Sequence, residues 1–333
     1  MKFLVIGSGS IGKRHMRNLL ALGTAASNIT AVDTRENRRD EVRAMGIEAV
    51  HATFEDALAA DTYNAAAVCS PTSMHIQQGI ELAKRGIHIL MEKPLDRDLT
   101  GIEDFRKAVA DNNVYVAMAY IFRSTPLIDK VRSLLAEDVI GKVLYVRGEF
   151  SEYLPDWHPY EDYRSFYMAE KSLGGGSILD QSHIMDLIHH LLGGFKSVYA
   201  FNSQVSSLEL NADDIAEMVV TLKSGIIASI HTDIFGRDHK KMLEIKGEKG
   251  NIAWDHYLNQ VRVYDSESKS TRVFSKFPTD FNLGYIEQMR RFIDGCNGGT
   301  PDLATLEEGI ETMELILAAE KSHETGKVEN VGG

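Results

Sequence analysis

Gly7-Ser-Gly9-Ser-Ile-Gly12 is the stretch of sequence that decides the fold. It directly follows the apolar run 3–6 and opens a helical pattern that extends to residue 22. A G-x-G-x-x-G motif alone is a weak signal, but between a buried strand and a helix it is typical of a dinucleotide-binding βαβ unit. The first glycine permits a tight turn, the second lets the backbone approach a pyrophosphate, and the third allows close helix packing. A glycine turn without a ligand is the alternative.

The apolar runs that follow extend this pattern into a sheet. They are rich in Val, Ile and Ala without polar alternation, as strands buried on both faces are, and helical patterns separate them. The expected strands are 3–6, 29–32, 65–68, 87–91 and 114–118, with a weaker candidate at 48–50. This alternation predicts an α/β fold in which a Rossmann domain, a doubly wound parallel sheet, occupies residues 1–121.

A different pattern occupies residues 122–333. Several strands follow one another between 197 and 274 without intervening helices, which favours a mostly antiparallel, open sheet. Expected helices are 126–135, 178–192, 282–296 and 303–325, and a strand is expected over 142–152. We therefore predict a second, α+β domain over these residues, whose last helix is a candidate to return to the first domain. The long connection 153–176 is expected to be a functional loop.

Composition excludes several classes of protein. The 333 residues carry a formal charge of −12, and no basic stripe indicates nucleic-acid binding. No apolar run reaches the roughly 18 residues that a membrane span needs. The two cysteines, Cys69 and Cys296, form no CxxC pair and cannot build a disulfide framework. We expect a cytoplasmic protein with a small-molecule substrate.

Asp33 ends the second expected strand, where an acidic residue accepts hydrogen bonds from the adenosine ribose. This favours NAD, and makes NADP less expected, because a carboxylate repels the 2′-phosphate. Arg35, Arg38 and Arg39 weaken the inference. The expected cofactor-binding residues are Gly7, Ser8, Gly9, Ser10, Ile11, Gly12, Asp33, Thr34, Arg35, Ser70, Pro71, Thr72, His75, Glu92, Lys93 and Pro94.

Ser70, Pro71 and Thr72 belong to this set because ligands bind beyond the carboxyl ends of parallel strands. Alternatively, Thr72 or Ser73 is only a helix N-cap. His75 is either a site residue or a surface or capping histidine.

Glu92-Lys93-Pro94 follows the fifth expected strand. Lysine is unexpected at the end of a buried strand unless its ammonium has a task, and a cis Lys93–Pro94 bond would aim it into the crevice. A cationic nicotinamide disfavours the charged lysine and so suits it to proton transfer. A solvated lysine before a turn is the alternative.

A second informative stretch runs from Gly174 to Asp186. Asp180, His183 and Asp186 are spaced three apart at a helix start, so neighbouring pairs are expected to share a face. A histidine oriented by a carboxylate suits the removal of a hydroxyl proton during hydride transfer. A structural Asp–His pair is the alternative. A metal site that adds His189 and His190 has no recognised ligand motif, and we expect none.

Together, GSGSIG, Asp33, SPTSMH, EKP and GGGSILDQSHIMD resemble the glucose–fructose oxidoreductase/inositol dehydrogenase/MocA (Gfo/Idh/MocA) family. The resemblance implies a catalytic Lys93, an acid/base His183 supported by Asp180, and dimers or tetramers built through the C-terminal sheet. Two departures are visible. Family members usually place the histidine four residues after the aspartate, not three, and many carry Asn in place of Ile121.

Residues 155–159 and 162–167 resemble a subgroup associated with bacterial surface sugars, which implies a sugar or nucleotide sugar as substrate. Aromatic residues such as Tyr160 and Tyr167 suit stacking on sugar rings; alternatively, they pin a long loop. The expected substrate-binding residues are Lys93, Arg123, Trp157, His158, Tyr163, Arg164, Asp180 and His183.

The function predicted from the sequence is hydride transfer between a nicotinamide cofactor and a secondary alcohol or ketone of a sugar, nucleotide sugar or cyclitol. One alternative is a redox-neutral lyase or glycosidase-type enzyme that retains NAD. The other is a non-catalytic cofactor sensor, against which the presence of both Lys93 and His183 argues.

Overall fold

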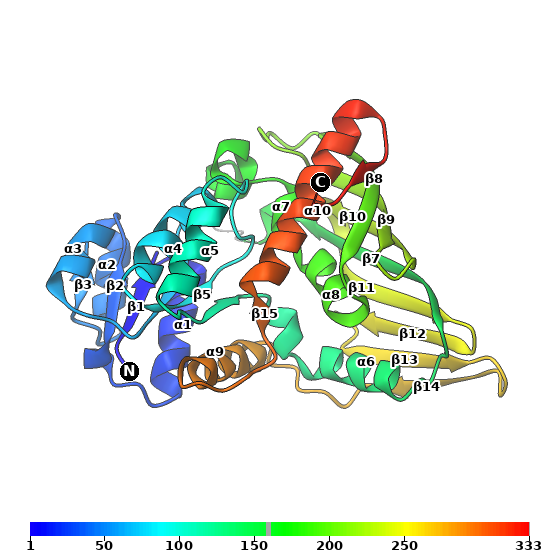
Figure 1. Cartoon of the computed structure of the whole chain (residues 1–333), viewed down its shortest axis with the longest axis horizontal. Coiled ribbons are helices and arrows are strands. Elements are labelled where there is room, and N and C mark those ends of the chain that lie inside the picture. The colour runs from blue at the N-terminus through cyan, green and yellow to red at the C-terminus, as the bar shows by residue number, and fades with distance from the viewer. Residues whose placement is uncertain (158–160, 333) are drawn as a thin grey trace. The chain divides into compact units, whose positions relative to one another are not determined.

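The computed structural model describes residues 1–157 and 161–332. The chain divides into two compact units (Figure 1). Unit 1 comprises Met1–Ile121 and Asn282–Leu306, and unit 2 comprises Phe122–Phe281 and Glu307–Gly333. The C-terminal stretch that unit 1 includes carries α9 (Asn282–Cys296) and β15 (Ala304–Thr305), whereas nearly all of α10 (Leu306–Thr325) belongs to unit 2.

The sheet of unit 1 has the strand order β15-β6-β5-β4-β1-β2-β3. All strands from β1 to β6 pair in parallel, and β15 pairs antiparallel with β6. The strands are β1 (Phe3–Ile6), β2 (Ile29–Val32), β3 (Val50–His51), β4 (Ala65–Val68), β5 (His88–Met91) and β6 (Val116–Met118). The order 3-2-1-4-5-6 is that of a Rossmann fold, so the predicted fold class is confirmed.

Helices cover this sheet, which explains its uninterrupted apolar strands. Every residue of β1, β2 and β4 is buried, and Leu4 and Val5 are fully enclosed. The helices are α1 (Ser10–Ala21), α2 (Glu36–Arg43), α3 (Phe54–Ala60), α4 (His75–Ala83), α5 (Ile102–Asp111) and α9. Because β1, β2, β4 and β5 run parallel, their carboxyl ends lie at one edge of the sheet.

Unit 2 contains a second sheet, of order β14-β13-β12-β11-β7-β10-β9-β8-β16. Its strands pair antiparallel except that β7 and β10 pair in parallel. The strands are β7 (Val143–Tyr153), β8 (Phe195–Ser203), β9 (Ile215–Leu222), β10 (Ile227–Asp233), β11 (Phe235–Gly247), β12 (Gly250–Asp255), β13 (Gln260–Asp265), β14 (Ser270–Phe274) and β16 (Glu329–Asn330). This agrees with the expected α+β architecture.

One face of this sheet packs on helices and the other is open. Gly148 of β7 lies against α8 (His183–Leu192), and a Cβ at that position would come within 2.5 Å of Ile184 Cγ1. The opposite face exposes large apolar side chains on three neighbouring strands, namely Tyr199, Phe201, Val219 and Ile227. The remaining helices of unit 2 are α6 (Pro126–Ala136), α7 (Ser177–Asp180) and α10.

Two local features differ from the expected elements. The helix predicted over 178–192 is broken into α7 and α8, which Gln181 and Ser182 separate. The connection 153–176 contains short 3-10 helices: η4 (Leu154–Asp156), η5 (Tyr163–Ser165), η6 (Tyr167–Ala169) and η7 (Lys171–Leu173). Within the described residues, no helix is long and apolar enough to cross a membrane.

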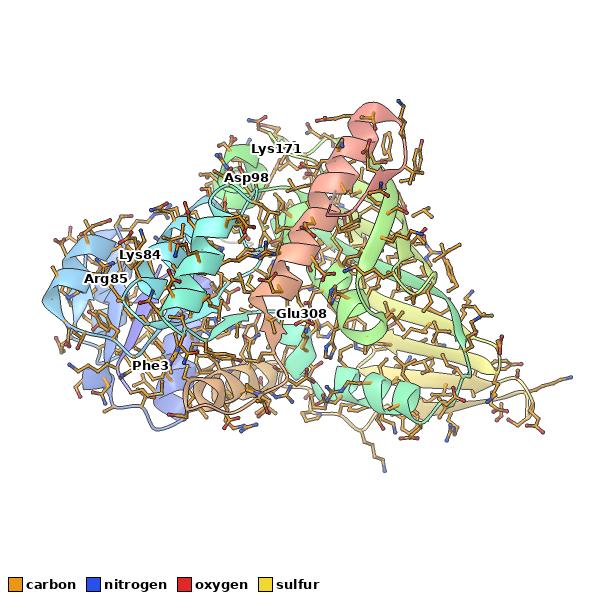
Figure 2. All side chains as sticks on the ribbon, in the orientation of Figure 1. Phe3, Lys84, Arg85, Asp98, Lys171 and Glu308 are labelled. Carbon is orange, nitrogen blue, oxygen red and sulfur yellow. The ribbon has the colours of Figure 1, made fainter. Side chains whose placement is uncertain are left out.

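A buried ion-pair network joins three elements of unit 2. Arg123, in η3 (Ile121–Ser124), donates from Nε and Nη2 to Asp186 of α8 at 2.7–3.0 Å. Its Nη1 donates to Glu308 at 2.9 Å. Glu308 lies on α10 (Figure 2). Arg123 is 1% exposed and Asp186 0%. Burial raises the pKa of Asp186, while Arg123 opposes that effect. The charged form of Asp186 is therefore stabilised by the Arg123 guanidinium.

We expect Arg123→Met to destabilise unit 2 by about 3–5 kcal/mol, because it leaves Asp186 buried without its cation. Differential scanning calorimetry measures the change as a lower Tm. Arg132→Met is the matched control, since Arg132 pairs with Asp129 at the surface and its loss should cost no more than about 0.5 kcal/mol. Equal melting temperatures for the two variants would contradict the role given to the network.

Candidate functional site

The glycine-rich loop after β1 forms a steric cradle. Gly7 has a φ of +91°, and a Cβ there would lie 2.4 Å from the Cys69 carbonyl oxygen. A Cβ on Gly12 would lie 1.9 Å from the Gly7 carbonyl oxygen. Among the described residues, no side chain caps the N-terminus of α1, which starts after Gly9. Its first backbone N–H groups are therefore available to an anion, as the pyrophosphate of a dinucleotide requires.

Asp33 lies beside this loop at the end of β2. Its carboxylate accepts hydrogen bonds from the Ser8 N–H at 2.8 Å and the Arg35 N–H at 2.9 Å. The Arg38 guanidinium lies 3.6 Å from the same carboxylate, and Arg39 donates to the Asp33 and Thr34 carbonyl oxygens. A carboxylate and a guanidinium thus occupy the same corner of unit 1.

The residues that follow β4 form hydrogen bonds and a short helical turn within unit 1. Ser70 Oγ donates to Gln78 Oε1 at 2.7 Å. Thr72 begins the 3-10 helix η2 (Thr72–Met74), whose N-cap is Pro71, and the N-cap of α4 is Met74. The N-cap alternative for Thr72 or Ser73 is therefore wrong.

His75 is buried rather than a surface histidine. It is 1% exposed, and its Nδ1 and Nε2 each lie 3.0 Å from a carbonyl oxygen, of Pro94 and Ser70 respectively. It joins the segment that follows β4 to the segment that follows β5.

Glu92, Lys93 and Pro94 occupy the same edge of the sheet, and the Lys93–Pro94 bond is cis. Glu92 Oε1 lies 2.8 Å from Nε2 of the fully buried His15, and Glu92 Oε2 accepts from the Lys93 backbone N–H at 3.4 Å. Helix α1 therefore contacts the segment that carries Lys93.

His15, Cys69 and Glu92 offer ligand-type atoms within 4.8 Å of one another. His15 and Glu92 already share a hydrogen bond. Burial, together with the charge of Glu92, raises the pKa of Cys69 well above its usual range, so the thiol stays protonated. This chemistry favours a hydrogen-bonded cluster over a metal centre, and we assign no metal to it.

Asp180 and His183 lie on either side of the α7–α8 break. Asp180 is buried and accepts a hydrogen bond from Tyr167 Oη at 3.0 Å. The His183 ring packs edge-on against Phe122, with centroids 5.1 Å apart. Asp186 bonds to Arg123. The interruption separates Asp180 from His183, so no continuous helix sets a common face for that pair, whereas His183 and Asp186 both lie on α8, three residues apart.

Four described aromatic residues of the 153–176 connection, Trp157, Tyr163, Phe166 and Tyr167, pack on an apolar cluster. Trp157, Tyr163 and Tyr167 contact a core of buried residues, which comprises Leu154, Met168 and Ile234. The structure thus supports the alternative in which these rings pin the loop. His158 and Tyr160 lie outside the described residues.

The two arginines expected to bind substrate have protein partners. Arg164 is exposed and bonds to Asp162 and Glu209. Arg123 lies in the buried network with Asp186 and Glu308. Arg123 was expected to contact the substrate. In the structure, its side chain is 1% exposed and its guanidinium is paired with two carboxylates.

A charged cluster near His183 was not predicted from the sequence. Glu152, Lys241, Tyr257 and Gln181 converge in unit 2. A signal was present in β7, because Val146, Gly148 and Phe150 face the core at alternate positions and Glu152 continues their phase. A carboxylate at a core-facing position requires donors, and so points to a polar cluster.

Comparison with known proteins identifies the family. A model described as the NAD-binding Rossmann fold of an oxidoreductase family matches residues 1–120. The model of that family's C-terminal alpha/beta domain matches residues 132–331. The chain belongs to the Gfo/Idh/MocA oxidoreductase family. It is an NAD(P)-dependent oxidoreductase, and the predicted family, enzyme class and NAD cofactor are confirmed.

Relatives of known activity match the chain along its whole length. The myo-inositol 2-dehydrogenase of Thermotoga maritima is 26% identical over 97% of this chain and 96% of that protein. The structure of levoglucosan dehydrogenase with NADH and levoglucosan has a TM-score of 0.88, at 19% identity over 100% of both chains. The WlbA dehydrogenase of Bordetella pertussis, in complex with NADH and UDP-GlcNAcA, has a TM-score of 0.85 at 20% identity, over 100% of this chain and 98% of that one.

We expect Gly12→Ala to weaken NAD binding by at least about tenfold, or about 1.4 kcal/mol, since its methyl group displaces the Gly7 carbonyl. Titration of protein fluorescence with NADH measures the affinity. Gly23→Ala is the control at the other end of α1, where a Cβ meets no atom within 4 Å. It should cost some stability because of its positive φ and leave the affinity unchanged; similar losses of affinity in both variants would contradict the steric argument.

We expect Asp33→Ser to shift the ratio of NADP to NAD affinity at least about tenfold towards NADP, since it removes the repelling carboxylate and releases Arg38. Titrations with NADH and NADPH measure the ratio. The control is Asp40→Ser, which removes an exposed carboxylate paired with Arg43 on α2. An unchanged ratio in Asp33→Ser would show that Asp33 does not select the cofactor.

Proposed function

We propose that this enzyme transfers a hydride between NAD and a secondary alcohol or ketone of a sugar, nucleotide sugar or cyclitol. The observation that carries the proposal is the position of Lys93, which directly follows Glu92 at the strand edge that also presents the glycine cradle. The relatives that act on myo-inositol and levoglucosan support the substrate class.

The residues of the chain supply binding and proton transfer. NAD, when bound, supplies the hydride acceptor. We propose that Gly7, Gly9 and Gly12 admit its pyrophosphate and that Asp33 accepts its ribose hydroxyls. The other expected residues after β1, β2, β4 and β5 line the same edge of the sheet. These assignments rest on the open N-terminus of α1 and on the close backbone approaches around it.

We assign the hydroxyl proton of the substrate to Lys93 and His183. Removal of this proton makes the carbinol carbon a better hydride donor, and both side chains suit general acid–base catalysis. Asp180, which Tyr167 holds, orients His183 or the substrate hydroxyl. Trp157, His158, Tyr163 and Arg164 remain proposed substrate contacts, whereas Arg123 is left out because of its buried ion pairs.

The open face of the unit 2 sheet supports assembly into a homodimer or homotetramer. Its exposed apolar residues on β8, β9 and β10 include Tyr199, Phe201 and Val219, an arrangement that favours burial against another copy. We further propose that the enzyme acts in the cytoplasm, where its free cysteines, Cys69 and Cys296, stay reduced.

We expect Lys93→Ala to lower kcat by about 10²-fold or more while NAD affinity stays close to that of the wild type. Absorbance of NADH, measured across a panel of inositols, free sugars and nucleotide sugars, identifies the substrate and gives kcat. Lys84→Ala is the control, since Lys84 is an exposed lysine just after α4 (Figure 2).

Loss of NAD binding in Lys93→Ala would instead assign the lysine a structural role. Product formation without net NADH would favour a redox-neutral lyase that retains NAD. A panel without turnover, from a protein that still binds NAD, would favour a cofactor sensor.

A further inference from the structure

Glu152, near the end of β7, is a buried carboxylate with three side-chain donors. It is 8% exposed. Its Oε1 accepts from Tyr257 Oη at 2.7 Å and lies 2.9 Å from Lys241 Nζ. Its Oε2 accepts from Gln181 Nε2 at 3.3 Å. The carboxylate thus joins β7 to β11, to the residues after β12 and to the α7–α8 break.

These contacts keep the Glu152 carboxylate negatively charged. Burial alone would raise its pKa, but Lys241 and the hydrogen bond from Tyr257 outweigh burial and lower it. Burial and the bond to Glu152 raise the pKa of Tyr257, so the phenol remains a donor. Glu152 therefore accepts hydrogen bonds as an anion, and Gln181 must present its N–H groups to it.

Gln181 is one of the two residues that separate α7 from α8. Asp180 precedes it at the end of α7, and His183 begins α8 two residues later. The start of α7 is fixed independently, since Asp213 accepts from Ser177 Oγ at 2.8 Å and from the Ile178 N–H at 2.9 Å. The short helix that ends at Asp180 is thus held at its start by Asp213, and the break after it is held by Glu152.

We propose that Glu152 is a positioning residue, which holds the α7–α8 break through Gln181 so that Asp180 and His183 keep the orientation needed for proton transfer. This inference rests on the function proposed above for those two residues. Replacing a buried ion pair by apolar residues of similar size often leaves stability unchanged or raises it, and in some proteins such pairs instead specify geometry. The Glu152 cluster contacts a helix break that lies between the two proposed proton-transfer groups. Its position therefore suits a role in specifying their geometry.

The main test uses Gln181→Met, which keeps the approximate side-chain size and removes the donor to Glu152. Glu152→Gln would unpair Lys241 and reduce the yield of folded protein, so it is the secondary variant. The matched control is Gln204→Met. It removes a glutamine donor of the same unit, which bonds to the Leu208 carbonyl oxygen at 2.8 Å.

Two readouts are measured on the full-length protein. The first is the NMR signal of the His183 ring, assigned by its loss in His183→Asn, which requires no substrate. The second is the pair kcat and KM for NAD, measured with whichever compound of the panel is turned over. We expect Gln181→Met to shift the His183 signal and lower kcat roughly tenfold to a hundredfold, with KM for NAD unchanged. Gln204→Met should change neither.

A His183 signal and a kcat that both match the wild type in Gln181→Met would overturn the proposal. Equal changes in Gln181→Met and Gln204→Met would also overturn it, because they would reflect a general loss of packing. If no compound of the panel is turned over, the proposed function has failed, and the NMR signal alone decides whether Glu152 positions His183.

Discussion

Close backbone approach at the end of β1 is the constraint on which unit 1 depends. A side chain at position 12 would overlap the Gly7 carbonyl oxygen, and one at position 7 would overlap that of Cys69. Glycine at both positions allows α1 to begin against the sheet with its first N–H groups open. Because β2, β4 and β5 run parallel to β1, Asp33, Ser70 and Glu92 follow at the same edge. The requirement for glycine at positions 7 and 12, together with the parallel pairing of the strands, therefore places the proposed cofactor contacts at one edge of the sheet.

In unit 2, buried carboxylates determine where the helices begin and end. A carboxylate removed from water must be paired, so each one determines the position of its donors. Asp186 draws η3 and α10 towards α8 through Arg123, Asp213 fixes the start of α7, and Glu152 holds the break that follows. Apolar packing places these helices on the sheet, while the polar contacts determine where each begins and ends.

The sequence predicted unit 1 better than unit 2, for physical reasons. Strands buried on both faces are continuous apolar runs, so β1, β2 and β4 were predicted to the residue. The break in the helix expected over 178–192 was missed because the carboxylates that bond to α7 and to the break, Asp213 and Glu152, are distant in sequence. The ion pair of Arg123 was missed for the same reason, since Asp186 lies 63 residues away. Local patterns identify groups that need partners, but tertiary structure decides which partners they find.

The three-residue gap between Asp180 and His183 illustrates this limit. In a continuous helix, a gap of three or four residues specifies an angle between two side chains. Here the helix is interrupted between them, so the gap alone specifies no angle, and the contacts of the break replace it. The Asp180 carboxylate is held by Tyr167, whose ring packs with Trp157 and Tyr163 on the apolar cluster of the loop. Pinning the loop and holding the Asp180 carboxylate are therefore one structural task, because Tyr167 packs on the cluster that secures the loop and also donates to Asp180.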